Sequence, residues 1–250
     1  MSGPVQVVIT MAGLGSRFRK VGYQVPKYRI LARGRSLFDW SMESLRSFID
    51  EGAHFIFVMR EEDASADFVR DRAAALGIAS CAIVEIDALT DGQATTALLA
   101  APEISDPDAP FLIYNIDTHV DPSALPASAV RGEGWIPCFA AEGDAWSFVA
   151  LGTDGRACEV REKTRISPHA TIGLYYFASF SLYRSLYDET YTEGGLLEAG
   201  ERYVAPMYNA LIARGADVFI HDVPPGAFAP LGTPDEVLQF DPEASPDRVV

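Results

Sequence analysis

The chain has 250 residues, of which 48% are hydrophobic, and this length fits one large domain with a full core. Its 35 acidic residues outnumber its 20 basic residues and give a formal net charge of −15, so its field repels nucleic acids and anionic lipid surfaces. The cysteines Cys81, Cys138 and Cys158 lack CxxC spacing, which argues against a zinc site or a disulfide framework. We expect three reduced, packed thiols.

The beginning of the chain lacks the pattern of a secretory signal, because a strand-like run starts at Val5 with no basic stretch and apolar region before it. No stretch of eighteen apolar residues occurs that would predict a membrane span. We therefore expect a cytoplasmic protein that binds neither membranes nor nucleic acids.

Strand and helix patterns alternate in the first half. Continuous apolar runs of the kind buried on both faces of a sheet occur at 5–10, 54–59, 81–86 and 111–116. Helical patterns lie between them, at 37–49 before Gly52, at 68–76 before Gly77, and from about 93 to 101. Repeated strand–helix–strand units predict a parallel sheet with helices on both faces, and such sheets bind ligands at the carboxyl ends of their strands.

The second half has short strand candidates at close spacing, at 135–140, 146–152, 157–163 and 171–177, with turn signals at Gly143-Asp144 and Asp154-Gly155. These predict antiparallel additions to the sheet. Helices are expected at 182–187 and 203–214, followed by a strand at 217–223 and a last helix with Thr233 as N-cap and Pro234 as its first residue. The segment 241–250 is polar and is expected to be loose. The fold class is α/β, with a Rossmann-like, mostly parallel central sheet.

The first strand ends in a basic glycine turn. Gly13 and Gly15 allow backbone amides to approach a ligand closely, and the basic residues that follow, Arg17, Arg19 and Lys20, suit a polyphosphate. A solvated basic turn fits the same residues. The turn lacks the third glycine of a dinucleotide fingerprint, since Phe18 stands there, and it lacks Walker A spacing.

A wider pattern resembles a known family. The stretch "MAGLGSRF" at 11–18, followed by Pro26-Lys27, is similar to the signature loop of the sugar-1-phosphate nucleotidylyltransferases, G-x-G-[ST]-R with a later P-K. Four further stretches match that family in order: "DGQATTAL" at 91, "YNIDTHV" at 114, "EKTRISPHATIGLYYF" at 162 and "PLGTPDEVLQF" at 230. The resemblance spans most of the chain. It indicates the short form, without an appended left-handed β-helix, and a subgroup associated with capsule and surface polysaccharides.

The resemblance implies a nucleotide-binding half over about 1–120 of one domain that spans 1–250. In the family, the glycine loop holds a nucleoside triphosphate and two basic side chains neutralise its phosphates; here these basic residues are Arg17 and Lys27. Backbone contacts to the triphosphate are expected from Ala12, Gly13, Gly15 and Ser16, and contacts to the base from Gly92 and Gln93.

The same resemblance implies an acceptor-binding half over about 121–240. Asp117 is expected to ligate Mg²⁺, which prefers oxygen ligands, at the end of an apolar strand where a carboxylate is otherwise costly. By family position, Glu162 bonds to sugar hydroxyls, Lys163 binds the acceptor phosphate and Gly173 lines the sugar pocket. His119 is given no role.

One departure concerns the metal. Many family members carry a second metal-binding aspartate two residues before the Gly-Thr pair, and this chain has Pro230 there. Either another carboxylate, with Asp222 the nearest on the preceding strand, supplies the oxygen, or Asp117, phosphates and water suffice. An inactive paralogue also remains open.

The expected reaction is transfer of a nucleoside monophosphate to a phosphorylated acceptor, with Arg17, Lys27 and Lys163 as catalytic groups and Mg²⁺ as cofactor. The acceptor that we mainly expect is a sugar 1-phosphate. The alternatives are a CTP-dependent enzyme for a non-sugar phosphate of the phosphocholine or phosphoglutamine type, and a non-catalytic nucleotide-binding protein. A glycosyltransferase is less favoured, because Asp117-Thr118-His119 lacks the second Asp of a DxD motif. The sequence leaves the base, the acceptor and a possible homo-oligomer undecided.

Overall fold

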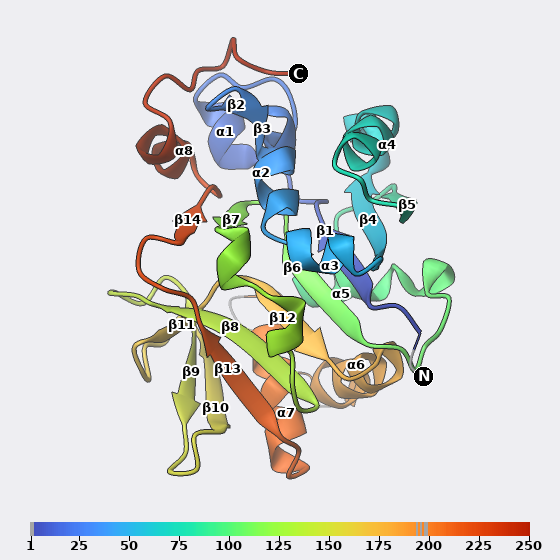
Figure 1. The fold of residues 1–250 in the computed structure, drawn as a ribbon, viewed down its shortest axis with the longest axis vertical. Helices are drawn as coiled ribbons and strands as arrows, with labels where there is room; N and C mark the ends of the chain where they lie inside the picture. Colours follow the sequence, from blue (N-terminus) through green and yellow to red (C-terminus); the bar gives the residue numbers. More distant parts are fainter. Residues whose placement is uncertain (1–2, 194, 196, 198–199) are drawn as a thin grey trace.

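The computed structural model of the protein describes residues 3–193, 195, 197 and 200–250. Its core is a ten-stranded sheet (Figure 1). Four strands of the first half are parallel in the order β6, β1, β4, β5, as expected. Their bounds are Gln6–Thr10 (β1), His54–Arg60 (β4), Ser80–Ile86 (β5) and Phe111–Asn115 (β6). The predicted parallel sheet is therefore confirmed, with β5 at its edge.

Helices cover both faces of this sheet, because successive side chains of a strand point to opposite sides. One core cluster joins Val8 and Ile113 to α5 (Gln93–Leu98), α6 (Phe180–Tyr187) and α7 (Tyr208–Ala213). A second cluster joins Val7 and Phe57 to α2 (Leu37–Glu43), α3 (Arg46–Asp50) and α4 (Ala66–Ala75). The expected three-layer arrangement is confirmed.

The second half extends the same sheet with antiparallel strands. β12 (Leu174–Phe177) pairs with β6 and with β8 (Gly134–Ala140), and the sheet continues through β11 (His169–Thr171), β9 (Ser147–Leu151) and β10 (Ala157–Glu162). β13 (Val218–Asp222) pairs with β8 in parallel. The turn at Asp154-Gly155 joins the neighbours β9 and β10, whereas β11 lies between the two strands that flank Gly143-Asp144.

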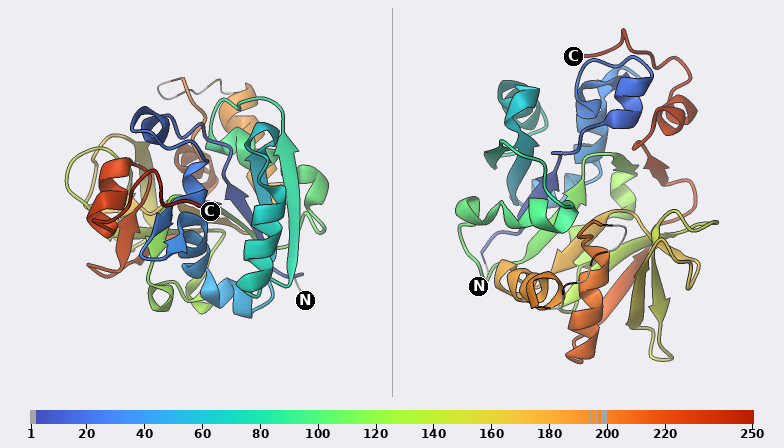
Figure 2. Two further views of the ribbon diagram at one scale, coloured as in Figure 1. Left: turned by 90° about the horizontal axis from the view of Figure 1, so that it is seen from above. Right: turned by 180° about the vertical axis from the view of Figure 1, so that it is seen from behind.

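A smaller region lies at one end of the molecule, where α1 (Ser16–Lys20) and α8 (Pro234–Phe240) lie close to each other (Figures 1 and 2). It contains two small sheets, β2 (Leu31–Ala32) with β3 (Arg35–Ser36), and β7 (Thr118–Val120) with β14 (Phe228–Pro230). A separate hydrophobic cluster that includes Phe18, Leu231 and Val237 holds this region together. Short 3₁₀ turns are Lys27–Arg29, Glu61–Asp63, Ala101–Glu103, Pro122–Ala124, Ala127–Ala129 and Ala205–Met207, and Asp188–Glu193 forms a π-helical turn.

Two expected helices differ from the structure. The pattern at 37–49 forms two helices, because the Ser44 hydroxyl donates to the Trp40 carbonyl (3.3 Å) and accepts from the Val120 amide (2.9 Å), which diverts it from regular helix. The helix expected from 203 begins as a 3₁₀ turn at Ala205, because Pro206 has no N–H and fits a first turn. The N-cap Thr233 is confirmed, since its hydroxyl accepts from the Glu236 amide.

The segment 241–250 is not loose. Val249 forms a β-bridge with Ile30, and the Leu31 amide donates to the Arg248 carbonyl (2.8 Å). The Asp241 carboxylate accepts from the Arg33 amide (2.6 Å). The polarity of this segment predicted a free tail. The short β2–β3 hairpin leaves backbone groups unpaired, and these groups bind the segment.

The cysteines are free thiols, as expected, but only Cys138 is packed. Cys81 and Cys158 are exposed because β5 and β10 lie at the two edges of the sheet. None of the described helices is long and apolar enough to cross a membrane.

Candidate active site

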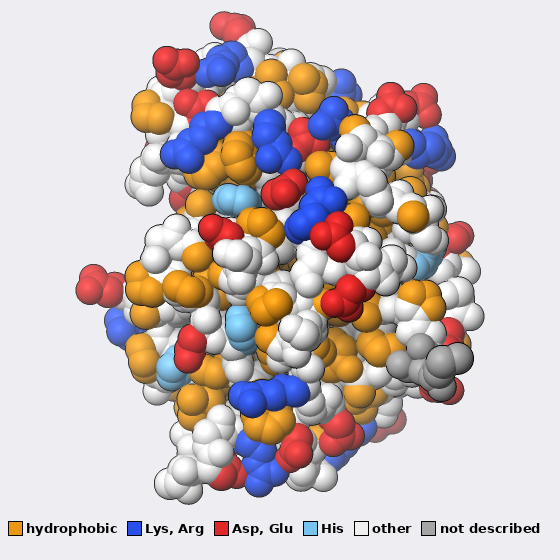
Figure 3. Space-filling model, viewed as in Figure 1, with side chains coloured by type: hydrophobic (Ala, Val, Ile, Leu, Met, Phe, Trp, Pro, Cys, Tyr) orange, Lys and Arg blue, Asp and Glu red, His pale blue; other side chains and the backbone are white. Residues whose placement is uncertain are grey.

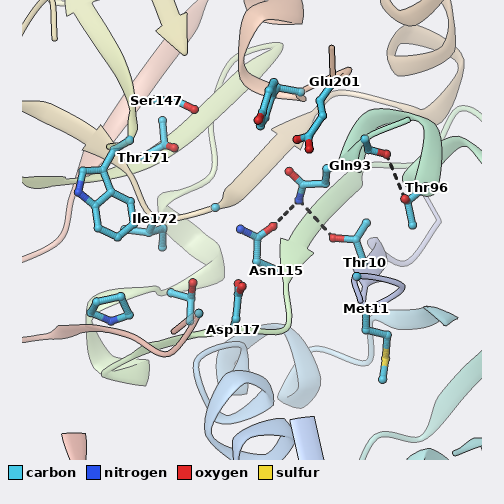
Figure 4. Close-up of a pocket in the computed structure, with 18 of the residues that line it drawn as sticks. Thr10, Met11, Gln93, Thr96, Asn115, Asp117, Ser147, Thr171, Ile172 and Glu201 are labelled. Carbon is cyan, nitrogen blue, oxygen red and sulfur yellow. Dashed lines mark hydrogen bonds between the residues drawn. The ribbon is translucent and has the colours of Figure 1, made fainter. Parts of the chain in front are cut away.

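A cavity of about 710 Å³ opens at the carboxyl ends of β1 and β6, between the two halves of the sheet. Ten of the twelve residues expected to form the site line it; Gly15 and Ser16 do not. The loops expected to bind the nucleotide lie on one side, the residues expected to bind the acceptor lie on the other, and Asn115 and Asp117 lie between them (Figure 4). The structure therefore brings together residues that are far apart in sequence.

The glycine loop after β1 presents its backbone to this cavity. A Cβ at Gly13 would meet nothing within 4 Å, so the loop faces open space there. Gly15 has a φ of +59°, a conformation that glycine adopts freely, and it starts α1. Phe18, only 1% exposed, anchors α1 so that Arg17 lines the cavity. Arg19 donates instead to the Leu14 carbonyl and does not line the cavity.

The second nucleotide loop is held by backbone contact with the segment around Arg202. A Cβ on Gly92 would lie 2.4 Å from the Arg202 carbonyl oxygen, so only glycine fits. The Arg202 amide donates to the Asp91 carbonyl (2.7 Å), and the Ala94 amide donates to the Arg202 carbonyl (3.0 Å). The Arg202 guanidinium forms an ion pair with the Asp91 carboxylate, with 3.1 Å between Nε and Oδ2. Gly92 thus has a packing role besides any ligand contact.

Gln93 extends from this loop across the floor of the cavity. Its amide nitrogen donates to Thr10 Oγ1 (3.2 Å) and to Asn115 Oδ1 (Figure 4). A Cβ at Gly173, whose φ is +84°, would lie 2.3 Å from the Asn115 amide nitrogen. Gly173 is therefore required for Asn115 to occupy the junction between the two halves.

Lys27 and Asp117 form an ion pair at this junction. Their Nζ and Oδ2 atoms are 2.6 Å apart, and their side chains are 18% and 25% exposed. Pro26 fixes the backbone before Lys27, and the fully buried Tyr28 anchors the residue after it. Asp117 follows β6, as its place in the sequence predicted. The cationic group beside Asp117 is the Lys27 ammonium.

The acceptor side consists of polar groups that bond to one another. The Glu162 carboxylate, 6% exposed, accepts a hydrogen bond from the Ser147 hydroxyl. Thr171 and Tyr175 share a hydrogen bond of 2.9 Å between their hydroxyls. Burial raises the pKa of Tyr175, so its phenol stays protonated. These side chains present hydroxyl and carboxylate groups to the cavity.

Lys163 is held in an unusual conformation beside Glu162. Its φ of +50° lies in the left-handed region, which few non-glycine residues adopt and which concentrates at functional sites. Its Nζ donates to the Tyr203 hydroxyl (2.7 Å) and lies 4.7 Å from the centre of that ring. The hydrogen bond to Tyr203 is the main cause that raises the pKa of Lys163, so the ammonium stays charged at neutral pH.

Residues 201–203 therefore bridge the two sides. The Arg202 backbone pins the Gly92 loop, while the next residue, Tyr203, positions Lys163. We name residues 201–203 the bridging segment. Both Glu201 and Tyr203 line the cavity.

Several lining residues were not expected from the sequence: Thr10, Asn115, Trp146, Ser147, Tyr203 and Glu236. Asn115 could have been found, because it is a polar residue at the end of an apolar strand beside Asp117. The others lack a local signal, since only the fold brings them to the cavity.

Two residues considered for the metal lie elsewhere. Asp222 does not line the cavity; its side chain is 77% exposed and lies 3.5 Å from His169 Nδ1. His119, for which no role was expected, packs against both Trp40 and Phe240, and its Nδ1 bonds to the Trp40 carbonyl (2.9 Å). Pro230 lines the cavity but offers no side-chain oxygen.

The cavity lining contains more acidic than basic residues, although its basic residues were expected to bind phosphate groups. Three basic residues (Arg17, Lys27, Lys163) line it with four acidic ones (Asp117, Glu162, Glu201, Glu236). On the face drawn in Figure 3, groups of both signs are likewise interspersed. Two phosphorylated ligands would add further negative charge, so the residues present fit a divalent cation. Within the described residues, no group of three or more His, Cys, Asp or Glu residues lies close enough together to hold a metal ion.

No family model and no curated protein matches this chain. Among solved structures, it is similar to the nucleoside-diphosphate-sugar pyrophosphorylase from Vibrio cholerae RC9, with 33% identity and a TM-score of 0.87 over 94% of this chain and 98% of that chain. The inositol-1-phosphate CTP transferase from T. maritima shares the fold, with 17% identity and a TM-score of 0.74 over 94% of this chain and 93% of that chain.

The expected fold class is thereby confirmed. At 33% identity over nearly the full length of both proteins, the chain belongs to the nucleotidyltransferase family that includes nucleoside-diphosphate-sugar pyrophosphorylases.

Proposed function

We propose that this protein transfers a nucleoside monophosphate from a nucleoside triphosphate to a sugar 1-phosphate and releases pyrophosphate. The observation that carries the proposal is a single cavity with glycine loops on one side, hydroxyl and carboxylate groups on the other, and the Lys27–Asp117 pair between them. The 33% identity to a nucleoside-diphosphate-sugar pyrophosphorylase supports the same reaction class.

The nucleotide would lie against the glycine loop. Gly13 leaves room for phosphate groups to approach the backbone, and Arg17 and Lys27 would neutralise the triphosphate and the departing pyrophosphate. Leu89, 55% exposed, and the buried Met11 line the same side and offer apolar surface to a base. Lys27 would exchange part of its contact with Asp117 for phosphate oxygens.

The acceptor would lie on the opposite side, with its phosphate near Lys163 and its hydroxyls near Glu162 and Ser147. One phosphate oxygen of the acceptor attacks the α-phosphorus; a new P–O bond forms as the bond between the α-phosphorus and the bridging oxygen breaks. A phosphate monoester has a second pKa near 6, so the nucleophile is already anionic at neutral pH and needs no protein base. Catalysis then rests on positioning and on charge stabilisation.

The metal fits the junction. Asp117 is the carboxylate that would hold Mg²⁺, whose chemistry is to neutralise charge on phosphate oxygens. This neutralisation matters because the cavity lining contains more acidic than basic residues.

A second candidate is a CTP-dependent transferase for a non-sugar phosphate. Trp146 lines the acceptor side, packed edge-on by Phe139 and Phe228, and an indole face can bind an alkylammonium group such as that of phosphocholine. A sugar 1-phosphate explains more of the residues that line the cavity. A choline group has no hydroxyls to bind the polar groups around Glu162 and Thr171. A cytoplasmic location, a role in capsule synthesis and a homo-oligomer stay predictions from the sequence.

The test is a screen for pyrophosphate release. Each reaction contains Mg²⁺, one triphosphate (ATP, CTP, GTP, UTP or dTTP) and one acceptor. The acceptors are glucose 1-phosphate, mannose 1-phosphate, a heptose 1-phosphate and phosphocholine, and products are identified by mass. The proposal expects one triphosphate to give a nucleotide sugar, and to lose this activity in Lys27→Met. Activity only with phosphocholine would establish the second candidate. Triphosphate binding without any product would indicate a non-catalytic nucleotide-binding protein.

A further inference from the structure

The family resemblance of the sequence leads us to expect a second carboxylate beside Asp117, two residues before the Gly232-Thr233 pair. Pro230 stands at that position; it ends β14 and pairs with Thr118 of β7, so its backbone is used by the small sheet. The Leu231 amide then donates to the Asp117 carbonyl (2.8 Å). The chain therefore passes directly beside Asp117 before α8 begins, with no side-chain oxygen from Pro230.

The surroundings of Gly232, two residues after Pro230, show which other carboxylate lies near Asp117. A Cβ placed on Gly232 would be 3.1 Å from Asp117 Oδ2 and 3.5 Å from Glu236 Oε2. The two carboxylate oxygens are therefore within about 6.6 Å of each other, the sum of those distances. A side chain at Gly232 would fill the space that both carboxylates border, and glycine keeps that space open.

Glu236 is fixed on the first turn of α8. Its amide donates to the hydroxyl of the N-cap Thr233 (3.2 Å), and Val237, the next residue, is fully buried in the cluster around Phe18. Its side chain lines the cavity. Within the described residues, the Glu236 carboxylate makes no hydrogen bond or ion pair, whereas that of Asp117 is paired with Lys27.

We propose that Glu236 is the second protein carboxylate for the divalent cation, in place of the missing aspartate. This inference rests on the proposed function, which supplies a triphosphate as the remaining source of ligands. The Lys27 ammonium, 2.6 Å from Asp117, shows that the space beside Asp117 accepts a cation, and a carboxylate has lone pairs for more than one partner. Two carboxylates completed by phosphate oxygens and water are the usual surroundings of Mg²⁺ in such sites.

The chain offers a matched control. Asp235 precedes Glu236 on the same turn of α8, but it is exposed and does not line the cavity. Asp235→Asn and Glu236→Gln remove the same charge from adjacent positions. A difference between the two variants therefore reports the position of the carboxylate and not the loss of net charge.

Mn²⁺ is the probe, because its electron paramagnetic resonance signal measures free and bound ion directly. Binding is titrated for the wild type and both variants, first with Mn²⁺ alone and then with ATP, CTP, GTP, UTP or dTTP present. The expected result is Mn²⁺ affinity about 10-fold or more weaker in Glu236→Gln and within about 2-fold of the wild type in Asp235→Asn, a range typical of changes around metal ligands. Equal affinity in the two variants would overturn the assignment.

A second variant at the same position distinguishes the loss of a metal ligand from a folding defect. Glu236→Asp keeps the charge and withdraws the carboxylate by one methylene, so it should weaken Mn²⁺ binding while leaving the thermal midpoint unchanged. Wild-type affinity in this variant would contradict direct ligation. If triphosphates bind the wild type and Mn²⁺ binding does not depend on Glu236, only this inference fails; if no triphosphate binds at all, the proposed function fails with it.

Discussion

The two sides of the cavity are built by different means. The side proposed to bind the nucleotide uses backbone: Gly13 opens onto the cavity, and Gly92 fits only because it lacks a side chain. The acceptor side uses side chains that bond to one another, such as Ser147 with Glu162 and Lys163 with Tyr203. The triphosphate group is the same in every nucleoside triphosphate, so a fixed backbone can bind it. Sugar 1-phosphates, in contrast, differ from one another in the arrangement of their hydroxyls. The comparison suggests that the second side sets acceptor choice.

The largest expected effect comes from the junction that both sides share. Asp117→Asn removes the charge that pairs with Lys27 and would hold the cation, so pyrophosphate release should fall by about 10²–10³-fold, the scale of losing one preorganised electrostatic group. The measurement is turnover at saturating substrates. A fall of less than about 3-fold would show that the two sides work without this carboxylate.

A smaller effect is expected where the sides are packed together. Gly173→Ala would place a Cβ 2.3 Å from the Asn115 amide at a φ of +84°, so thermal unfolding should show a loss of about 2–3 kcal/mol. Gly143→Ala is the control, because Gly143 has a φ of +77° but nothing within 4 Å of its Cβ position, and only the backbone cost of about 1 kcal/mol remains. Equal losses would mean that the contact with Asn115 is unimportant.

A substitution in the bridging segment should affect the two sides of the cavity differently. Tyr203→Phe removes the hydrogen bond to Lys163 and keeps the ring, so the KM for the acceptor should rise by about 3–10-fold, equivalent to about 1 kcal/mol. The KM for the triphosphate should not change, because the Gly92 loop contacts the Arg202 backbone and not the Tyr203 ring. A parallel rise in both KM values would argue that the segment acts as one structural unit.

The smallest effect concerns pH. Burial lowers the pKa of His119, which lies two residues after Asp117, and Arg35 adds to this effect. The folded protein therefore holds a neutral imidazole, while the unfolded chain protonates near pH 6.5, so stability is lost as pH falls below that value. Between pH 7.5 and 5.5, the free energy of unfolding measured with denaturant should fall less for His119→Asn than for the wild type. An identical decrease in both proteins would show that His119 is not the group responsible.

Local patterns in the sequence were enough for much of this structure. The four buried runs predicted the parallel strands, and Thr233-Pro234 predicted the start of α8, because each signal lies within a few residues. The glycine loop was recognisable for the same reason: its spacing is fixed by the turn that it makes.

Other features depend on contacts between distant segments and could not be read in this way. The tail at 241–250 is polar, yet it pairs with the backbone around Ile30. Tyr203 meets Lys163 across 40 positions of sequence, and Glu236 borders the same space as Asp117 beside Gly232, which follows the pairing of β14 with β7. The pairing of Lys27 with Asp117 was also missed, since the two residues were assigned to different ligands.

The central claim is that one cavity binds a triphosphate on the side of Lys27 and a different substrate on the side of Glu162. The most direct measurement is thermal unfolding of the wild type, Lys27→Met and Glu162→Gln with each of the five triphosphates and Mg²⁺. A ligand at ~100 times its Kd stabilises by about 2.7 kcal/mol, or about 5–10 °C for a chain of this size. The account predicts that one triphosphate gives this shift in the wild type and in Glu162→Gln but not in Lys27→Met. The absence of a shift with every triphosphate, or the same loss in both variants, would contradict it.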